Sequence, residues 1–396
     1  MRKLSVALAV ILAASAWCAA AEPQEDPRAN VPLEGRHAGE VVKLFRRAAT
    51  VKVMDVTPCE KIQFTDLFKF DCYGDEALAQ LRSQEKLDDV IAKGKTEFAR
   101  QVLLMDWAHR RIKLFGQPTK PEAKKPLDIL KAVDEGHAFN CGYYARLLRE
   151  ALRSVGYVAR SVGLKGSKSD GNGTEHAIVE VWSNQAGKWF VLDPTLNVYF
   201  VKGVPLNAWE IRKEWFYNGG NDPRMRIVVG TDAKTYTKAD LPIERGTHKG
   251  FGTLKLSAES LGKFLYLAYM PTKPDGSLDY AAMFITKDKL CEGVPYHTRK
   301  NPADPALEPY WPMQQAAVHF ERRGGINLEF FLKTLTPDFE TFRYRIDGKA
   351  WTDCGEGTNE APNAWRLHEG TNSLEVVAVN KFGIEGRPSR IVLERD

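Results

Sequence analysis

Three residues able to carry out covalent chemistry follow one another in the middle of the chain: Cys141, His176 and Asp193. A thiol attacks a carbonyl carbon as its thiolate, and a nearby histidine takes the thiol proton and later returns it to the leaving group. An acid behind the histidine fixes the ring tautomer and stabilises the imidazolium. We therefore predict a nucleophilic cysteine site, with Cys141 as nucleophile, His176 as general base and acid, and Asp193 as orienting acid.

The element that must position Cys141 is a predicted helix over residues 141–155. An apolar stripe recurs there at helical spacing, Asn140 is a good N-cap and Gly156 is a good terminator. Unpaired N–H groups at a helix start favour negative charge, so they lower the pKa of a thiol placed there. The same groups would hold the oxyanion of a tetrahedral intermediate.

The other two residues lie on a predicted hairpin. In residues 176–182 alternate side chains face opposite ways: Ala177, Val179 and Val181 share one face, and His176, Ile178, Glu180 and Trp182 share the other. Residues 188–193 form a second strand, and Asn184-Gln185-Ala186-Gly187 makes the turn. Because the strands of a hairpin lie side by side, we expect Asp193 to contact His176.

Each residue also has a plainer interpretation. Cys141 would be a small buried residue at a helix start, which is the commoner fate of a lone cysteine. His176 would mark a strand edge, and Asp193-Pro194 would be only a turn. The three residues together, in the order helix, strand, strand, favour the catalytic interpretation.

The surrounding pattern predicts the fold class. Residues 76–114 indicate two helices divided at Gly94, and a short helix follows at 127–133. Further strands are predicted at 157–164 and 197–201. Helices followed by an antiparallel sheet are typical of an α+β domain.

The chain beyond Gly246 changes to short alternating strands and turns. Residues 315–396 have the spacing of an all-β sandwich of about seven strands. Residues 247–314 are β-rich too, and would form either a separate small module or extra strands of that sandwich. Trp351 and Trp365 would suit a sugar face, but aromatics in a sandwich of this size more often belong to its core.

The stretch around the three residues resembles the transglutaminase-like superfamily over roughly residues 95–215. The resemblance rests on Cys141-Gly142-Tyr143-Tyr144-Ala145, Glu175-His176-Ala177 and Trp189-Phe190-Val191-Leu192-Asp193-Pro194-Thr195. It implies a papain-like α+β core whose catalytic triad is Cys141, His176 and Asp193. The C-terminal region resembles the immunoglobulin-like or fibronectin-like modules that accompany exported enzymes.

The sequence departs from this family in two respects. Asn140 stands where a glycine is frequent, and the calcium-binding acidic loops of the animal enzymes have no evident counterpart, so we expect no metal and no cofactor. We expect His137 to pack beside the helix start rather than to contact the cleft. The remaining histidines lack ligand spacing and are interpreted as surface or satisfied residues: His248, His297, His319 and His368.

The first residues predict export. Arg2 and Lys3 precede an apolar run over residues 4–16 that ends in Cys18-Ala19-Ala20-Ala21, as in a secretory signal cleaved near Ala21. The run is too short for a stable membrane anchor. Trp17 is a poor fit before a lipidated cysteine, so we expect a secreted or periplasmic protein with no anchor.

An exported chain can form disulfides. The simplest pairing joins Cys59 to Cys72 and Cys291 to Cys354, which the sequence alone does not prove. Under this pairing Cys141 keeps its thiol. The predicted parts of the chain are a signal peptide at 1–21, an N-terminal cap segment at 22–94, a catalytic domain at 95–246, a β-rich linking module at 247–314 and an immunoglobulin-like β-sandwich at 315–396.

The predicted chemistry forms a thioester from an amide or ester. Water would resolve it in a hydrolase, and a lysine amine would resolve it in a cross-linker; removal of glycans from asparagine is a further alternative. The resemblance favours a peptidase or amidase acting on protein or peptide substrates, including cell-envelope or glycan-associated ones. A non-catalytic exported binding protein is the alternative from another class. With 56 Lys and Arg against 51 Asp and Glu, the charge is too balanced to indicate a nucleic-acid partner.

Overall fold

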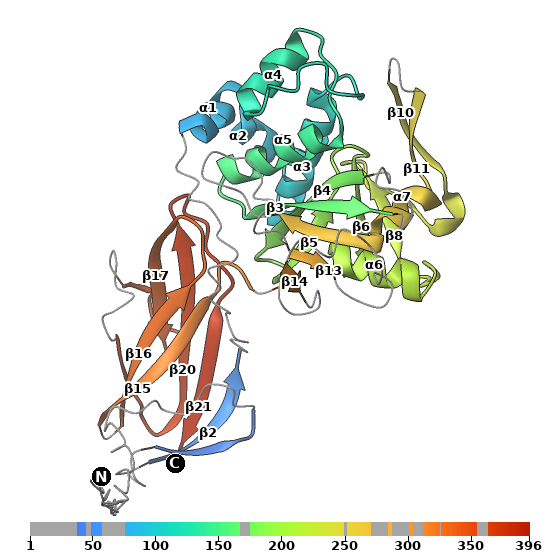
Figure 1. Cartoon of the computed structure of the whole chain (residues 1–396). Coiled ribbons are helices and arrows are strands. Elements are labelled where there is room, and N and C mark those ends of the chain that lie inside the picture. The colour runs from blue at the N-terminus through green and yellow to red at the C-terminus, as the bar shows by residue number, and fades with distance from the viewer. Residues whose placement is uncertain are drawn as a thin grey trace, which may run out of the picture.

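The computed structural model describes residues 38–44, 49–57, 76–166, 175–248, 252–270, 284–286, 301–303, 310, 312–324, 326–354 and 363–396. A part with helices and three sheets meets an elongated β-sandwich at one junction (Figure 1). No helix within these ranges is long and apolar enough to cross a membrane. The predicted signal peptide, Cys59, Cys72 and Cys291 lie outside them, so both disulfide pairings stay predictions.

The helical layer precedes the sheet, as the sequence predicts. Its helices are α1 (Glu76–Gln84), α2 (Leu87–Ala92), α3 (Glu97–Arg111), α4 (Pro126–Asp134) and α5 (Cys141–Ser154). Gly94 does separate two helices, but residues 76–114 contain three rather than two. The extra break occurs at Lys86, which has left-handed φ and precedes α2.

Helix α5 is the central element of this layer. It contacts α1, α3, α4 and the two strands that follow it in sequence, and its end is marked by Gly156 at φ +91°. Three charged residues of its face opposite the apolar stripe are not exposed. Arg149, Glu150 and Arg153 are buried, and Glu150 pairs with both arginines. Because buried charges are costly unless paired, this cluster indicates that the helix is enclosed on the face opposite its apolar stripe as well.

The main sheet has six strands in the order β14-β13-β12-β3-β4-β5. The predicted hairpin is confirmed as β4 and β5, and β3 pairs antiparallel with β4. The helices cover the face that carries Val179 and Val181, while Ile178 and Trp182 belong to the core on the other face. The bounds are β3 (Ala159–Lys165), β4 (Glu175–Ser183), β5 (Lys188–Leu192), β12 (Tyr266–Met270), β13 (Phe284–Thr286) and β14 (Asn301–Ala303).

The expectation for residues 247–314 is corrected by this topology. Strand β12 pairs antiparallel with β3, so this region extends the sheet of the helical part instead of forming a separate module or joining the sandwich. The Tyr310 hydroxyl donates to Glu180 at 2.9 Å, and Glu180 also forms a fully buried ion pair with Arg160. Pairing along β3 removes an exposed sheet edge, which sequence periodicity could not reveal.

A second sheet in the order β7-β6-β8-β9 packs beyond the hairpin. The strand predicted at 197–201 exists as β6, and it pairs with β8. The β10–β11 hairpin stands beside this part of the molecule (Figure 1). The elements are β6 (Val198–Lys202), β7 (Val204–Pro205), α6 (Ala208–Tyr217), β8 (Arg226–Val229), β9 (Lys234–Tyr236), η1 (Lys238–Asp240), β10 (Ile243–His248), β11 (Gly252–Leu256), α7 (Ala258–Gly262) and η2 (Lys263–Leu265).

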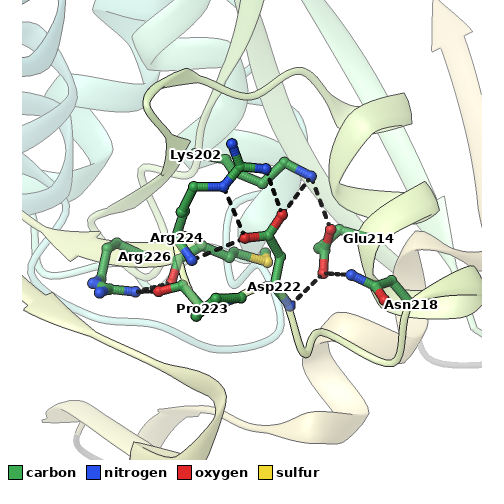
Figure 2. A network of polar contacts seen from close by, with 8 residues as sticks. Lys202, Glu214, Asn218, Asp222, Pro223, Arg224 and Arg226 are labelled. Atoms are coloured by element: carbon green, nitrogen blue, oxygen red, sulfur yellow. Dashed lines mark hydrogen bonds and ion pairs between the residues drawn. The ribbon is translucent and has the colours of Figure 1, made fainter.

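A polar network fixes the loop between α6 and β8 onto β6 (Figure 2). Glu214 accepts from Lys202 at 3.1 Å, from Asn218 at 2.7 Å and from the Asp222 N–H at 3.0 Å. Lys202 also pairs with Asp222, which Arg224 contacts through both its backbone and its side chain. The loop is thus held by charged hydrogen bonds from α6 and β6 and by the contacts of Arg224 with Asp222 within it.

Replacing Glu214 with glutamine is expected to lower the free energy of unfolding by about 1–3 kcal/mol, because hydrogen bonds to a buried charged acceptor are lost. Burial alone would raise the pKa of Glu214, but the Asp222 N–H, Lys202 and Asn218 hold it below its ordinary value. A carboxyl group with a lowered folded pKa stabilises the fold above its unfolded pKa, and this stability is lost as pH falls through the folded pKa.

Urea unfolding at pH 7 and about pH 3 measures this effect. The variant should lose stability at pH 7 and show a smaller decrease on acidification than the wild type. Glu244→Gln is the matched control, because Glu244 forms an exposed ion pair with Lys255 and should change little. Equal stability of Glu214→Gln and wild type at pH 7 would contradict the prediction.

The C-terminal part contains two sheets around one apolar core. The sheets have the orders β1-β2-β21-β20-β17-β18 and β15-β16-β19, and Trp365 is fully buried between them. Trp351 is half-buried, with the Arg345 guanidinium 4.8 Å from its ring centroid. The strands are β1 (Val41–Leu44), β2 (Ala49–Val56), β15 (Ala316–Gly324), β16 (Asn327–Thr334), β17 (Phe339–Ile346), β18 (Thr352–Asp353), β19 (Asn363–Arg366), β20 (Gly370–Asn380) and β21 (Ser389–Arg395).

The cap expected over residues 22–94 is corrected in its described N-terminal portion. Strands β1 and β2 form a hairpin, and β2 pairs antiparallel with β21 at the other end of the chain. The buried side chains of Val51 and Val53 complete the sandwich core. These residues therefore belong to the sandwich, while α1 and α2 belong to the helical layer.

The sandwich docks against the C-terminal end of α5, away from Cys141. Asn380 donates from its side chain to the Gly156 carbonyl at 3.0 Å in a buried contact. The Phe382 ring lies so close to Gly156 that a Cβ added there would come within 2.6 Å of it. Ile384 packs against the core that contains α5. The helix is thus held at the junction by residues more than 200 positions away.

Candidate active site

Cys141 is the first residue of α5, as predicted. The Asn140 side chain accepts a hydrogen bond from the Gly142 N–H at 3.1 Å, which confirms the predicted N-cap. Cys141 has a free thiol and is half-buried, whereas most of the helix behind it is buried. The fold therefore holds the thiol at the N-terminal end of a central helix, where the field of the helix favours a negative charge.

His176 and Asp193 contact each other directly. His176 Nε2 lies 2.7 Å from Asp193 Oδ2, and the side chains are 11% and 6% exposed. The register pairs Val179 with Leu192, so continuing it sets Asp193 opposite Ile178, two residues from His176 on the same face. Diagonal neighbours of this kind lie within reach of long side chains. The hairpin thus creates the contact.

The thiol completes this arrangement. The Cys141 side chain forms a hydrogen bond with the His176 ring, and the Ala177 N–H donates to the sulfur. Burial would raise the pKa of the Cys141 thiol, but the hydrogen bond and charge of His176 outweigh burial and lower it below its ordinary value. All three predicted residues therefore meet, while their catalytic roles stay a prediction.

His176 is held in its charged form. Burial by itself lowers the pKa of the ring, but the Asp193 charge and hydrogen bond, together with Cys141, raise it to about 10. A lowered thiol pKa and a raised imidazole pKa both favour a thiolate beside an imidazolium. This ion pair is the reactive form of a nucleophilic cysteine.

Asp193 is itself oriented by the loop that follows it. Its Oδ1 accepts from the N–H groups of Thr195 at 2.9 Å and Leu196 at 3.1 Å, which leaves Oδ2 for His176. Two residues that the sequence analysis missed hold the same loop: His109 of α3 contacts the Pro194 carbonyl, and Arg245 of β10 contacts the Leu196 carbonyl. Neither belongs to a local motif, so only the tertiary structure reveals them.

Two of the other histidines singled out by the sequence have contacts of their own. His137 contacts Thr119 at 2.9 Å, as expected for a residue packed beside the helix start. His368 contacts its neighbour Glu369 and lies 3.3 Å from Asp347 in the sandwich, and His297 is outside the described part of the chain. Within that part, no three His, Cys, Asp or Glu side chains are grouped to hold a metal ion.

Comparison with known proteins finds a similarity in the region of this site. Residues 84–194 match the family model of the transglutaminase-like superfamily. This stretch contains Cys141, His176 and Asp193. Among solved structures, a red sea bream transglutaminase matches with 10% identity and a TM-score of 0.21, over 75% of this chain and 68% of that one. No curated protein matches the chain.

Proposed function

We propose that this protein is an exported cysteine enzyme that cleaves amide bonds through a thioester on Cys141. The observation that supports the proposal best is the hydrogen-bonded line from the Cys141 thiol through the His176 ring to Asp193. The similarity of residues 84–194 to the transglutaminase-like superfamily agrees with this chemistry. We propose water as the acceptor, which makes the enzyme a peptidase or amidase.

In the proposed reaction the Cys141 thiolate attacks the amide carbonyl carbon and its electron pair forms the C–S bond. The His176 imidazolium gives its proton to the nitrogen as the C–N bond breaks, so a neutral amine leaves and a thioester remains. Water then attacks the thioester while His176 takes one of its protons. The C–S bond breaks, the carboxylic acid leaves, and thiolate and imidazolium return.

Alkylation of Cys141 by iodoacetamide tests the activated thiol. At pH 6 an ordinary thiol with a pKa of about 8.5 is less than about 1% ionised, so a thiolate held by His176 should react roughly 10- to 100-fold faster. The tryptic peptide that spans residues 132–146 reports Cys141 separately from the other cysteines. His176→Ala should remove the advantage. A wild-type rate equal to that of free cysteine would instead support the non-catalytic binding protein.

A second assay separates hydrolysis from cross-linking. The protein is incubated with a glutamine-rich acyl-donor protein and a fluorescent primary amine. We expect release of ammonia or peptide fragments without incorporated fluorescence, because water is the proposed acceptor. Fluorescence incorporated by the wild type and lost in Cys141→Ala would replace the hydrolase with a cross-linking transglutaminase.

We also propose that the substrate is a peptide or protein outside the cytoplasm. The support is the signal-like pattern of residues 1–21, with its basic start and its apolar run. Fractionation of expressing cells and sequencing of the mature N-terminus test this. A mature chain that begins at Glu22 in the exported fraction is the expected result, and an unprocessed chain in the cytoplasm contradicts it.

A further inference from the structure

The orientation of Asp193 depends on the short loop of residues 194–197, whose ends are joined by two backbone hydrogen bonds between Asp193 and Val198. The carboxylate takes its position from the N–H groups of Thr195 and Leu196, so any rotation of this backbone turns Oδ2 away from His176. Pro194 has no N–H to contribute to a ladder. Asn197, the last residue of the turn before β6, has a left-handed φ of 53°.

Two side chains from outside the hairpin hold the carbonyls of this loop. His109 Nδ1 lies 3.0 Å from the Pro194 oxygen, and Arg245 Nε donates to the Leu196 oxygen at 2.7 Å. His109 comes from α3, which also fixes Asn197 through Asp106 at 2.8 Å. Arg245 comes from β10, beyond the residues matched by the family model. The loop is therefore held from two sides.

We propose that His109 and Arg245 are positioning residues, which clamp the Pro194 and Leu196 carbonyls and so keep the Asp193 carboxylate on the His176 ring. The proposal rests on the proposed function, because it concerns the same cysteine site. Neither residue contacts Cys141 or the reacting atoms. Each acts through Asp193.

The chemistry of the contact defines the state of His109. A carbonyl oxygen only accepts, so Nδ1 carries the proton. Burial, followed by the positive charge of Arg245, lowers the pKa of His109 and outweighs the opposing effects of the Pro194 carbonyl, Asp106 and Asp193. His109 is thus neutral at neutral pH, and it holds the loop without placing a second imidazolium beside Asp193. The charge in the clamp comes from Arg245.

The test uses the full chain and two independent losses, His109→Leu and Arg245→Met. Each should reduce the rate of Cys141 alkylation at pH 6 by about 2- to 10-fold, the size expected for loss of one hydrogen bond. An NMR titration of ¹⁵N-histidine-labelled protein should show the pKa of His176 falling from about 10 toward its value in Asp193→Asn. His109→Asn keeps a donor near the Nδ1 position and should recover most of both effects.

Controls separate positioning from general damage. His368→Leu and Arg390→Met remove the same residue types from the sandwich and should leave both readouts unchanged. If His109→Leu does not fold, His109→Asn and Arg245→Met still decide the matter. His109→Asn as impaired as His109→Leu would overturn the role of the donor.

Failure of the clamp and failure of the proposed function give different results. The clamp alone is overturned if Cys141 alkylation in the wild type is fast and depends on His176, while His109→Leu and Arg245→Met both give the same readouts as the wild type. A wild-type Cys141 no more reactive than free cysteine and indifferent to His176→Ala overturns the proposed function and the clamp together.

Discussion

Replacing Asp193 with asparagine is expected to lower the turnover of a peptide amide roughly 10²- to 10⁴-fold. The Asp193 charge is the main influence that raises the pKa of His176 to about 10 against the effect of burial. Without it the pKa should fall toward the ordinary value of 6.5. The imidazolium that must protonate the leaving nitrogen then disappears above that pH, so the loss should be greatest on the alkaline side.

The measurement is the release of a fluorescent amine from a peptide-amide library between about pH 5 and pH 9. The alkaline limb of the profile should move to lower pH in Asp193→Asn, while the wild type keeps its activity toward about pH 9. Asp232→Asn removes an exposed aspartate in the turn before β9 and serves as the control. An Asp193→Asn profile parallel to that of the wild type would rule out the proposed role of Asp193.

Replacing Gly156 with alanine is expected to lower the free energy of unfolding by about 2–5 kcal/mol. Gly156 has φ of +91°, which costs an alanine about 1–2 kcal/mol, and the new Cβ would lie 2.6 Å from the Phe382 ring. Overpacking of this kind typically costs a further 1–3 kcal/mol. The substitution should weaken the end of α5 and the docking of the sandwich together.

Urea unfolding with matched variants separates the two causes. Gly370→Ala has a similar φ of +83° but meets nothing within 4 Å, so it should show the conformational cost alone. Gly156→Ala combined with Phe382→Gly should be less destabilised than the sum of the two single changes, because this pair removes the ring and also the Phe382 Cβ, which would lie 2.7 Å from the new Cβ. If Gly156→Ala lowers the free energy of unfolding no more than Gly370→Ala does, the Phe382 side chain moves aside at no cost and the predicted overpacking is wrong.

The sequence predictions are correct where a feature depends on residues that are close together in the chain. The start of α5 depends on Asn140 and Gly142, and the β4–β5 hairpin on alternation around a short turn. Both are local, and both were predicted. The faces of β4 also followed from alternation, which places Val179 and Ile178 in different cores.

The errors concern interactions between distant parts of the chain. Strand β2 pairs with β21, and β12 pairs with β3, so neither segment is the cap or module expected from its place in the sequence. Periodicity identifies a strand but not its partner, because any unpaired edge of suitable length satisfies the same backbone groups. The sequence analysis also missed that Glu150 is buried with its two arginines. A charged residue is usually exposed, and the sequence does not show when it is buried beside a partner of opposite charge.

The sequence by itself determined the chemistry available to this protein: a cysteine at a helix start, and a histidine and an aspartate on adjacent strands of a hairpin. These features depend on residues close in the chain, whose spacing sets their geometry. Only the tertiary structure decided that the Cys141 thiol forms a hydrogen bond with the His176 ring, and that His109 and Arg245 hold the loop after Asp193. Those contacts join elements whose approach is set by core packing, and packing depends on the whole chain at once.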